Sequence, residues 1–187
     1  MSNACSKKRG FTLVEALVVV AIMGILSGLG VVSLQGAVAN SRIKDAGINV
    51  TAFMQRAANE ATRLNEKLCA KVENDHKTIK LYKCLAVDET SGTCTTFGDV
   101  VDEMALEASN AFVTDKNCPD MTGAKTTPAT QMTLVPKIGV SPIPTGCLRV
   151  RYGGTDKYAA SVKMPNKFAM YYKLNYDGGA ASSWFEF

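Results

Sequence analysis

The longest apolar segment of the chain begins at Phe11 and ends at Leu34, and it contains a single charged residue, Glu15. Its 24 residues correspond to about 36 Å of α-helix, enough to cross a hydrocarbon core of roughly 30 Å. A carboxylate within such a segment is costly, and it is therefore a candidate functional residue. The pattern predicts a membrane-spanning helix in which Glu15 has a specific role.

Residues 35–72 predict an amphipathic continuation of the same helix. Apolar side chains recur there at steps of three and four residues, which places them on one helical face. They are Ile43, Ala46, Val50, Phe53, Ala57, Ala61, Leu64 and Leu68. This face predicts packing against a sheet, and the polar residues from Glu73 onward mark the expected end of the helix.

Residues 73–187 predict a globular head of antiparallel β-strands, because short runs of alternating apolar and polar residues are separated by turn residues. The predicted strands are 77–87, 131–135, 148–152, 158–162, 168–176 and 184–187. Gly153-Gly154 predicts a hairpin turn. We expect a short helix within 99–112 and mainly loop, with one strand, over 119–144. The chain as a whole predicts an α+β fold with a long N-terminal helix packed on an antiparallel sheet.

A short basic leader precedes the apolar segment: Lys7-Lys8-Arg9-Gly10 is followed by Phe11-Thr12-Leu13-Val14-Glu15. An ordinary secretory signal is cut after its apolar core, whereas the suitable cleavage site here lies before it. The apolar segment is therefore expected to stay in the mature protein. The leader cations are expected to hold the N-terminus in the cytoplasm, with the rest of the chain on the other side of the membrane.

From Lys7 to about Leu29 the chain resembles the class III signal of type IV pilins and of the related pseudopilins of type II secretion. The shared residues are Gly10, Phe11, Thr12, Leu13 and Glu15, in that order. The resemblance implies that a prepilin peptidase, a membrane aspartyl protease, cuts between Gly10 and Phe11 and methylates the Phe11 amine. It also implies a pilin-like fold. A proline that the family often carries is replaced here by Gly28-Leu29-Gly30, so no kink is implied.

Glu15 requires a partner for its charge in this setting. Cleavage after Gly10 would create a free amine on Phe11, one helical turn away. In a filament, the Glu15 carboxylate is expected to meet the Phe11 amine of a neighbouring subunit and to set the register between subunits. The alternative is a membrane anchor that spans the bilayer once and carries Glu15 incidentally.

The charge changes little about this interpretation. Removal of the three leader cations takes the formal net charge from +4 to +1, and a nearly neutral protein gives no case for nucleic acid as its main partner. Four segments are expected: a leader (1–10), a transmembrane or filament-core helix (11–34), an amphipathic helix (35–72) and a head (73–187). A head of roughly 115 residues is an ordinary size for one domain.

Five cysteines lie on the expected non-cytoplasmic side, where oxidation favours disulfides. They are Cys69, Cys84, Cys94, Cys118 and Cys147. The turn residues 88–92 favour a Cys84–Cys94 bridge, and a Cys118–Cys147 bridge would then close the irregular middle of the head. Cys69, which is expected on the helix, is left unpaired. The alternative is that all five are reduced core residues, and without a Cys-x-x-Cys pair a zinc site is disfavoured.

The head offers no pattern typical of catalysis, and no enzyme activity, metal or cofactor is expected. His76 is interpreted as a surface or capping residue, and Asp177 as part of a turn in preference to a Ca²⁺ site. Basic residues near the strand edges are interpreted as solvated charges, with DNA binding as a weaker alternative. They are Arg149, Arg151, Lys157, Lys163 and Lys167. Tyr171 and Trp184 are interpreted as core aromatics, with stacking on surface sugars as a weaker alternative.

These observations predict a structural subunit of a type IV pilus-like filament, polymerised through its N-terminal helix. The alternatives are a minor pseudopilin of a type II secretion system and a pilus-tip subunit for adhesion or DNA uptake. The expected partners are other pilin subunits, the prepilin peptidase and an inner-membrane assembly platform. The expected location is the inner membrane before assembly, and an extracellular pilus or a periplasmic pseudopilus afterwards.

Overall fold

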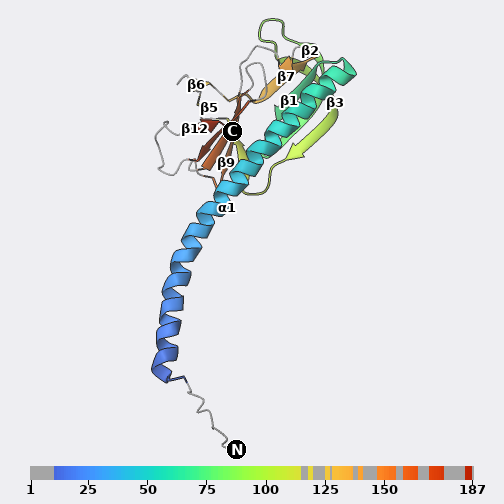
Figure 1. Cartoon of the computed structure of the whole chain (residues 1–187). Coiled ribbons are helices and arrows are strands. Elements are labelled where there is room, and N and C mark those ends of the chain that lie inside the picture. Colours follow the sequence, from blue (N-terminus) through green and yellow to red (C-terminus); the bar gives the residue numbers. More distant parts are fainter. Residues whose placement is uncertain are drawn as a thin grey trace, which may run out of the picture. The chain divides into compact units, whose positions relative to one another are not determined.

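The computed structural model describes residues 11–114, 118–119, 125–126, 128–136, 139–140, 147–154, 158–163, 169–174 and 184–186. The chain divides into two compact units, residues 1–38 and residues 39–187. The helix α1, Leu13–Leu64, supplies the described secondary structure of the first unit and the N-terminal part of the second. Each unit is described here by itself (Figure 1).

The end of α1 is defined by Asn65, which adopts a left-handed conformation with φ of 52°. The Asn65 N–H donates to the Thr62 carbonyl, and the Glu66 N–H donates to the Ala61 carbonyl, both at 3.3 Å. This pair of bonds is the Schellman arrangement that commonly closes helices. The predicted continuation of the helix to residue 72 is therefore wrong.

The residues just after the helix form a strand instead. β1, Leu68–Val72, pairs on both sides, with β2 and with β7. The step from Leu64 to Leu68 fits a helical face, but the chain reverses at Asn65, and Leu68 enters the core from the sheet. Cys69 accordingly lies on β1 and not on the helix.

Two five-stranded sheets make up most of the second unit (Figure 1). Sheet A has the order β3-β2-β1-β7-β8; its remaining strands are β2 (Thr78–Val87), β3 (Cys94–Ala105), β7 (Gln131–Val135) and β8 (Gly139–Val140). Sheet B has the order β12-β11-β10-β9-β4, with β4 (Asn110–Val113), β9 (Cys147–Tyr152), β10 (Tyr158–Lys163), β11 (Ala169–Leu174) and β12 (Trp184–Glu186). β5 (Cys118–Pro119) and β6 (Lys125–Thr126) form a two-stranded sheet. Every pair of these strands is antiparallel.

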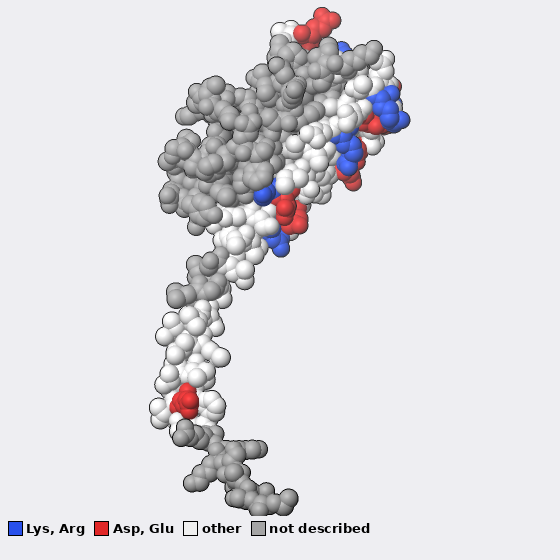
Figure 2. All heavy atoms as spheres, in the orientation of Figure 1, with Lys and Arg blue, Asp and Glu red and all other residues white. Residues whose placement is uncertain are grey.

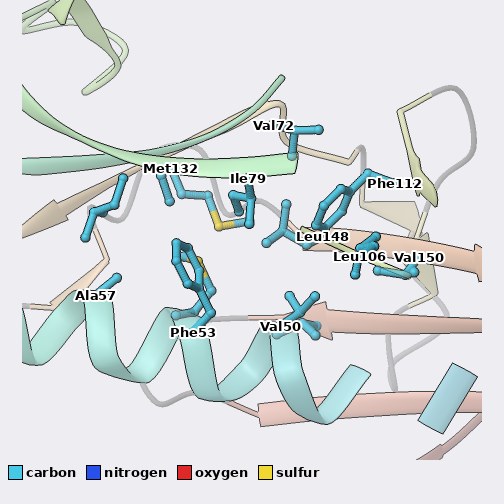
Figure 3. Packing of buried hydrophobic residues seen from close by; sticks show 14 of the residues in the cluster. Val50, Phe53, Ala57, Val72, Ile79, Leu106, Phe112, Met132, Leu148 and Val150 are labelled. Atoms are coloured by element: carbon cyan, nitrogen blue, oxygen red, sulfur yellow. The ribbon is translucent and has the colours of Figure 1, made fainter. Parts of the chain in front are cut away.

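The core of the second unit forms where α1 packs on both five-stranded sheets. Figure 3 shows Val50 and Phe53 of α1 directed toward Ile79 of sheet A and toward Leu148 and Val150 of sheet B. These side chains are at most 2% exposed. The predicted apolar face of the helix is confirmed from Ile43 to Ala61, because its members are buried: Ile43, Ala46, Val50, Phe53, Ala57 and Ala61.

The predicted α+β class and antiparallel head are confirmed, and so are the six predicted strands within one or two residues of their described ends. The hairpin predicted at Gly153-Gly154 joins β9 to β10, and both glycines have φ near +70°. The short helix predicted within 99–112 is wrong, since residues 99–105 belong to β3, residues 110–112 belong to β4, and the residues between them form a turn. In the region 119–144, β7 is joined by the short strands β6 and β8.

Candidate processing and assembly site

The N-terminal end of α1 is set by Thr12. Its hydroxyl Oγ1 accepts a hydrogen bond from the Glu15 backbone N–H at 3.3 Å, and its carbonyl accepts the first helical bond, from Ala16, at 3.2 Å. Thr12 is therefore the N-cap residue of the helix. Phe11 precedes the helix and is 81% exposed. Gly10, the other residue of the expected cleavage site, lies outside the described residues.

Glu15 occupies the third position of the helix, in its first turn. The spacing Thr12-x-x-Glu15 is that of a capping box, in which the acid also has the backbone N–H of the cap residue within reach. A carboxylate at this end of a helix is stabilised by the positive end of the helix dipole. Glu15 was predicted from the sequence as a functional residue, whereas the cap was not, although the Thr12-x-x-Glu15 spacing indicates it.

The N-terminal part of α1, from Leu13 to Leu34, exposes apolar side chains all around the helix. The exposed fractions of its large apolar side chains between Leu13 and Leu34 run from 42% at Val19 to 80% at Leu13. Glu15 is the only charged residue between Phe11 and Ser41, and Figure 2 shows this stretch as uncharged surface apart from one acidic spot. No described residue of the chain covers these side chains.

Among the described residues, no helix combines the length and the hydropathy that crossing a bilayer requires.

The cysteine predictions are confirmed in both pairs. Cys84 is bonded to Cys94, with Cα atoms 5.7 Å apart, and Cys118 to Cys147, with Cα atoms 6.4 Å apart. Cys69 is the free cysteine of the described region, and it is fully buried. Burial raises the pKa of its thiol to about 11. The alternative of five reduced cysteines is therefore wrong.

The weaker candidates of the head are not brought together into a site. His76 is exposed in the turn between β1 and β2, where its φ is 54°. Arg149 and Arg151 are half-buried on β9, an inner strand of sheet B, with their Nε atoms buried. Because β4 and β10 flank β9 on both sides, the two arginines do not lie at a strand edge. Both side chains are partly exposed, and their interpretation as solvated charges stays a prediction.

The remaining weak candidates cannot be placed as side chains. Lys157, Lys167 and Asp177 lie outside the described residues, and of Lys163, Tyr171 and Trp184 only the strands are described. Among the described residues, no group of three or more His, Cys, Asp and Glu side chains could hold a metal ion. The expectations of no cofactor and no enzyme activity stay predictions.

Residues 5–31 match the family described as the prokaryotic N-terminal methylation motif. The chain therefore carries this motif, and the resemblance seen around Gly10, Phe11 and Glu15 is confirmed over this segment. No protein with a curated function matches the sequence significantly.

The solved structures that are similar to the chain include a minor pseudopilin and a type IV minor pilin, both at low sequence identity. The minor pseudopilin EpsH of the type 2 secretion system of Vibrio cholerae is 11% identical, covers 69% of this chain and 95% of its own, and has a TM-score of 0.45. The type IV minor pilin FimU of Pseudomonas aeruginosa is 13% identical, covers 76% of this chain and 95% of its own, and also has a TM-score of 0.45. With TM-scores below 0.5, these similarities are weak. The function proposed below rests on the motif and on this chain's own residues.

Proposed function

We propose that this chain is the precursor of a structural subunit in a type IV pilus-like filament, and that it polymerises through the N-terminal part of α1. The observation that carries the proposal is that three features occur in the same segment of the chain. The methylation motif covers residues 5–31, and the same residues include the exposed apolar stretch of α1 and its single carboxylate, Glu15.

The proposed processing step is hydrolysis of the peptide bond between Gly10 and Phe11 by a prepilin peptidase. Hydrolysis leaves a carboxylate on Gly10 and an amine on Phe11, which then receives a methyl group. The position of Phe11 before the helix supports this step, because the residue that follows the bond to be cut lies outside the helix. The leader cations Lys7, Lys8 and Arg9 would keep this bond on the cytoplasmic side.

Before assembly, residues 11–34 are proposed to anchor the chain in the inner membrane, with the head on the other side. This part of the proposal rests on the motif and on the sequence of the segment. The exposed apolar side chains support it, since lipid or other subunits must cover them. The two disulfides also agree with a head outside the cytoplasm, where such bridges persist.

In the filament, the α1 segments of neighbouring subunits are proposed to cover one another. Glu15 would pair with the Phe11 amine of a neighbour. A buried pair of this kind is strongly unfavourable when either charge is missing, so it selects one register between subunits. The partners of this step are further copies of the chain or related subunits, held at an inner-membrane assembly platform.

The test of this proposal is the variant Glu15→Ala, compared with Glu15→Gln as an isosteric neutral control. Both variants should be cut after Gly10 as efficiently as the wild-type chain, because the carboxylate is not part of the bond that is cut. Both should fail to enter filaments, or enter them slowly, because the pairing charge is missing. The measurement is the amount of protein in fibres sheared from cells, with the amount left in membranes as the reference.

Wild-type fibre yield from both Glu15 variants would contradict the assembly role.

The distribution of the wild-type chain between sheared fibres and membranes separates the alternative functions. Abundance in sheared fibres indicates a major pilin, whereas retention in the membrane indicates a minor pilin or a pseudopilin of a type II secretion system. A tip subunit for adhesion or DNA uptake would be scarce in fibres and would lose binding when Arg149 and Arg151 are neutralised.

A further inference from the structure

Sheet A has one face on the core and one face directed away from it. The core-facing residues of β1 are Leu68, Ala70 and Val72. Cys69 and Lys71 alternate with them, so they lie on the opposite, outer face. Their register partners on β7, Thr133 and Gln131, share this face. Because Cys69 and Thr133 are nonetheless buried, another part of the chain must lie over the outer face.

The hairpin of β2 and β3 has an irregular distal half. Near its base, residues 78–81 pair with residues 102–105 without interruption. Beyond Leu81 the register shifts four times before the pair Val87 and Cys94. Shifts of this kind bend a strand pair and increase its twist. We define the strap as residues 83–98, the distal half of this hairpin.

Contacts between distant strands indicate that the strap lies over the outer face. Neighbouring strands are about 4.8 Å apart, so in a flat sheet β3 would lie roughly 14 Å from β7, three strands away. Gln131 Nε2 of β7 nevertheless donates a hydrogen bond to the Cys94 carbonyl of β3 at 3.4 Å. Lys71 Nζ also lies 4.8 Å from the centroid of the Phe97 ring. The start of β3 therefore bends back across β1 toward β7.

The β2 side of the strap is fixed at its start, where the Cys84 N–H donates to the Lys67 carbonyl at 2.9 Å and Lys83 Nζ lies 3.0 Å from Glu66 Oε2. Among the described residues, the β3 side has fewer contacts with the rest of the sheet. Phe97 makes an edge contact with Tyr82, with ring centroids 5.4 Å apart, and the Gln131 bond is long. The Cys84–Cys94 bridge joins the two strands of the strap, and Cys94 is only 3% exposed. Because Cys84 is fixed to the sheet, the bridge ties the start of β3 to it. Without the bridge, the start of β3 would be held over the outer face by the irregular ladder to β2 and by these side-chain contacts.

We propose that the Cys84–Cys94 disulfide is a redox latch, which holds the strap over the outer face of sheet A and keeps the Cys69 thiol out of disulfide exchange. Cys69 lies opposite Tyr82 on β2, two residues from Cys84. It is thus the diagonal neighbour of Cys84 in the β1–β2 pair. With the latch closed, burial keeps Cys69 away from solvent and raises its thiol pKa, which keeps the reactive thiolate scarce.

Opening of the latch is a two-electron reduction. A dithiol reductant attacks one sulfur of the Cys84–Cys94 bond, and its second thiol then displaces the mixed disulfide. The reductant leaves as its own disulfide, and Cys84 and Cys94 each carry a proton as thiols. The strap then separates from the sheet, and Cys69 becomes accessible. The Cys118–Cys147 bridge joins β5 to β9, outside sheet A, and is not part of the latch.

The first experiment compares alkylation of Cys69 by iodoacetamide in three full-length chains held in detergent micelles. They are the wild-type chain, the Cys84→Ser/Cys94→Ser variant and the matched control Cys118→Ser/Cys147→Ser. Mass spectrometry of the Cys69 peptide gives the rate. We expect the rate to rise by roughly tenfold or more in the first variant, as local opening exposes the thiol, and to stay near the wild-type rate in the control.

The second experiment needs no variant, so it remains decisive if a double variant does not fold. The wild-type chain is titrated with dithiothreitol and its cysteines are alkylated at each step. Labelling of Cys69 should appear together with labelling of Cys84 and Cys94, and should not follow that of Cys118. If Cys69 stayed protected from alkylation after the Cys84–Cys94 bridge was reduced, the proposal would be overturned. Equal exposure of Cys69 on loss of either bridge would overturn it as well. Neither result depends on filament assembly.

Discussion

At the scale of single residues, Glu15 is accommodated before any second subunit is present. The Thr12 cap starts the helix three residues earlier, which places the Glu15 carboxylate in the first turn, where the helix dipole favours a negative charge. A neighbouring Phe11 amine would then add a specific partner to a group that is already stabilised. Under the proposed function, Glu15 would therefore serve both the precursor and the filament.

Asp75 gives a prediction at the same scale. In the turn before β2 it accepts hydrogen bonds from the Thr78 hydroxyl and from the Lys77 and Thr78 N–H groups. These bonds, that of the Thr78 hydroxyl first, lower its pKa from 3.8 to about 2. Because the folded-state pKa is depressed, the stabilisation is present above about pH 4. It is lost as the pH falls toward the folded pKa of about 2.

The variant Asp75→Asn should therefore be less stable than the wild-type chain at neutral pH, and the difference should shrink as the pH falls below 4. The measurement is urea unfolding of the full chain in detergent at a series of pH values. Asp99→Asn is the control, because Asp99 is exposed on β3 and makes no hydrogen bond to a described residue. A difference for Asp75 that is independent of pH would show that the charge is not the cause.

At the scale of elements, the sequence predicted the strands and the buried face of α1 well, because periodicity is a local property. It failed where local signals compete. Residues 103–107 favour a helix by propensity, but Met104 and Ala105 pair with Ile79 and Thr78 of β2, and this pairing outweighs propensity. The helix end was missed because Leu64 and Leu68 keep the helical spacing across the reversal at Asn65.

The chain reversal at Asn65 leads to a prediction about the stability of variants at this position. A left-handed backbone is tolerated by Asn and Gly but disfavours β-branched residues. Asn65→Gly should leave the free energy of unfolding unchanged or slightly higher, whereas Asn65→Val should lower it by about 1–2 kcal/mol. Asn59→Val is the matched control, since Asn59 is exposed within α1 and should change stability by less than about 0.5 kcal/mol.

Urea unfolding monitored by circular dichroism measures all three variants. If Asn65→Val proved as stable as Asn59→Val, the left-handed residue would not be what ends the helix.

At the scale of the whole molecule, the two units differ in how their apolar side chains are covered. Residues 39–187 contain every described core residue, whereas the described side chains of residues 11–34 are exposed. The sequence predicted this division from the change between an all-round apolar helix and an amphipathic one. Under the proposed function, these side chains are covered by lipid before assembly and by other subunits afterwards.

A truncation tests this division. The chain without residues 1–38 should fold as a monomer in water and form both disulfides, because its core is complete. A chain without residues 1–55 should not unfold cooperatively, because it lacks Ile43, Val50 and Phe53. Each of these buried side chains contributes roughly 1.5–3 kcal/mol. Analytical ultracentrifugation and thermal unfolding check both fragments. Aggregation of the 39–187 fragment would mean that the first unit is needed to cover the head.

The most direct test of the proposed function is the mass of the mature N-terminus in cells that contain a prepilin peptidase. The account predicts an N-terminal peptide that begins at Phe11 and is heavier by one methyl group, and an uncut precursor when Gly10 is replaced by Val. A mature chain that keeps residues 1–10, or one that begins after the apolar segment at Leu34, would contradict the account.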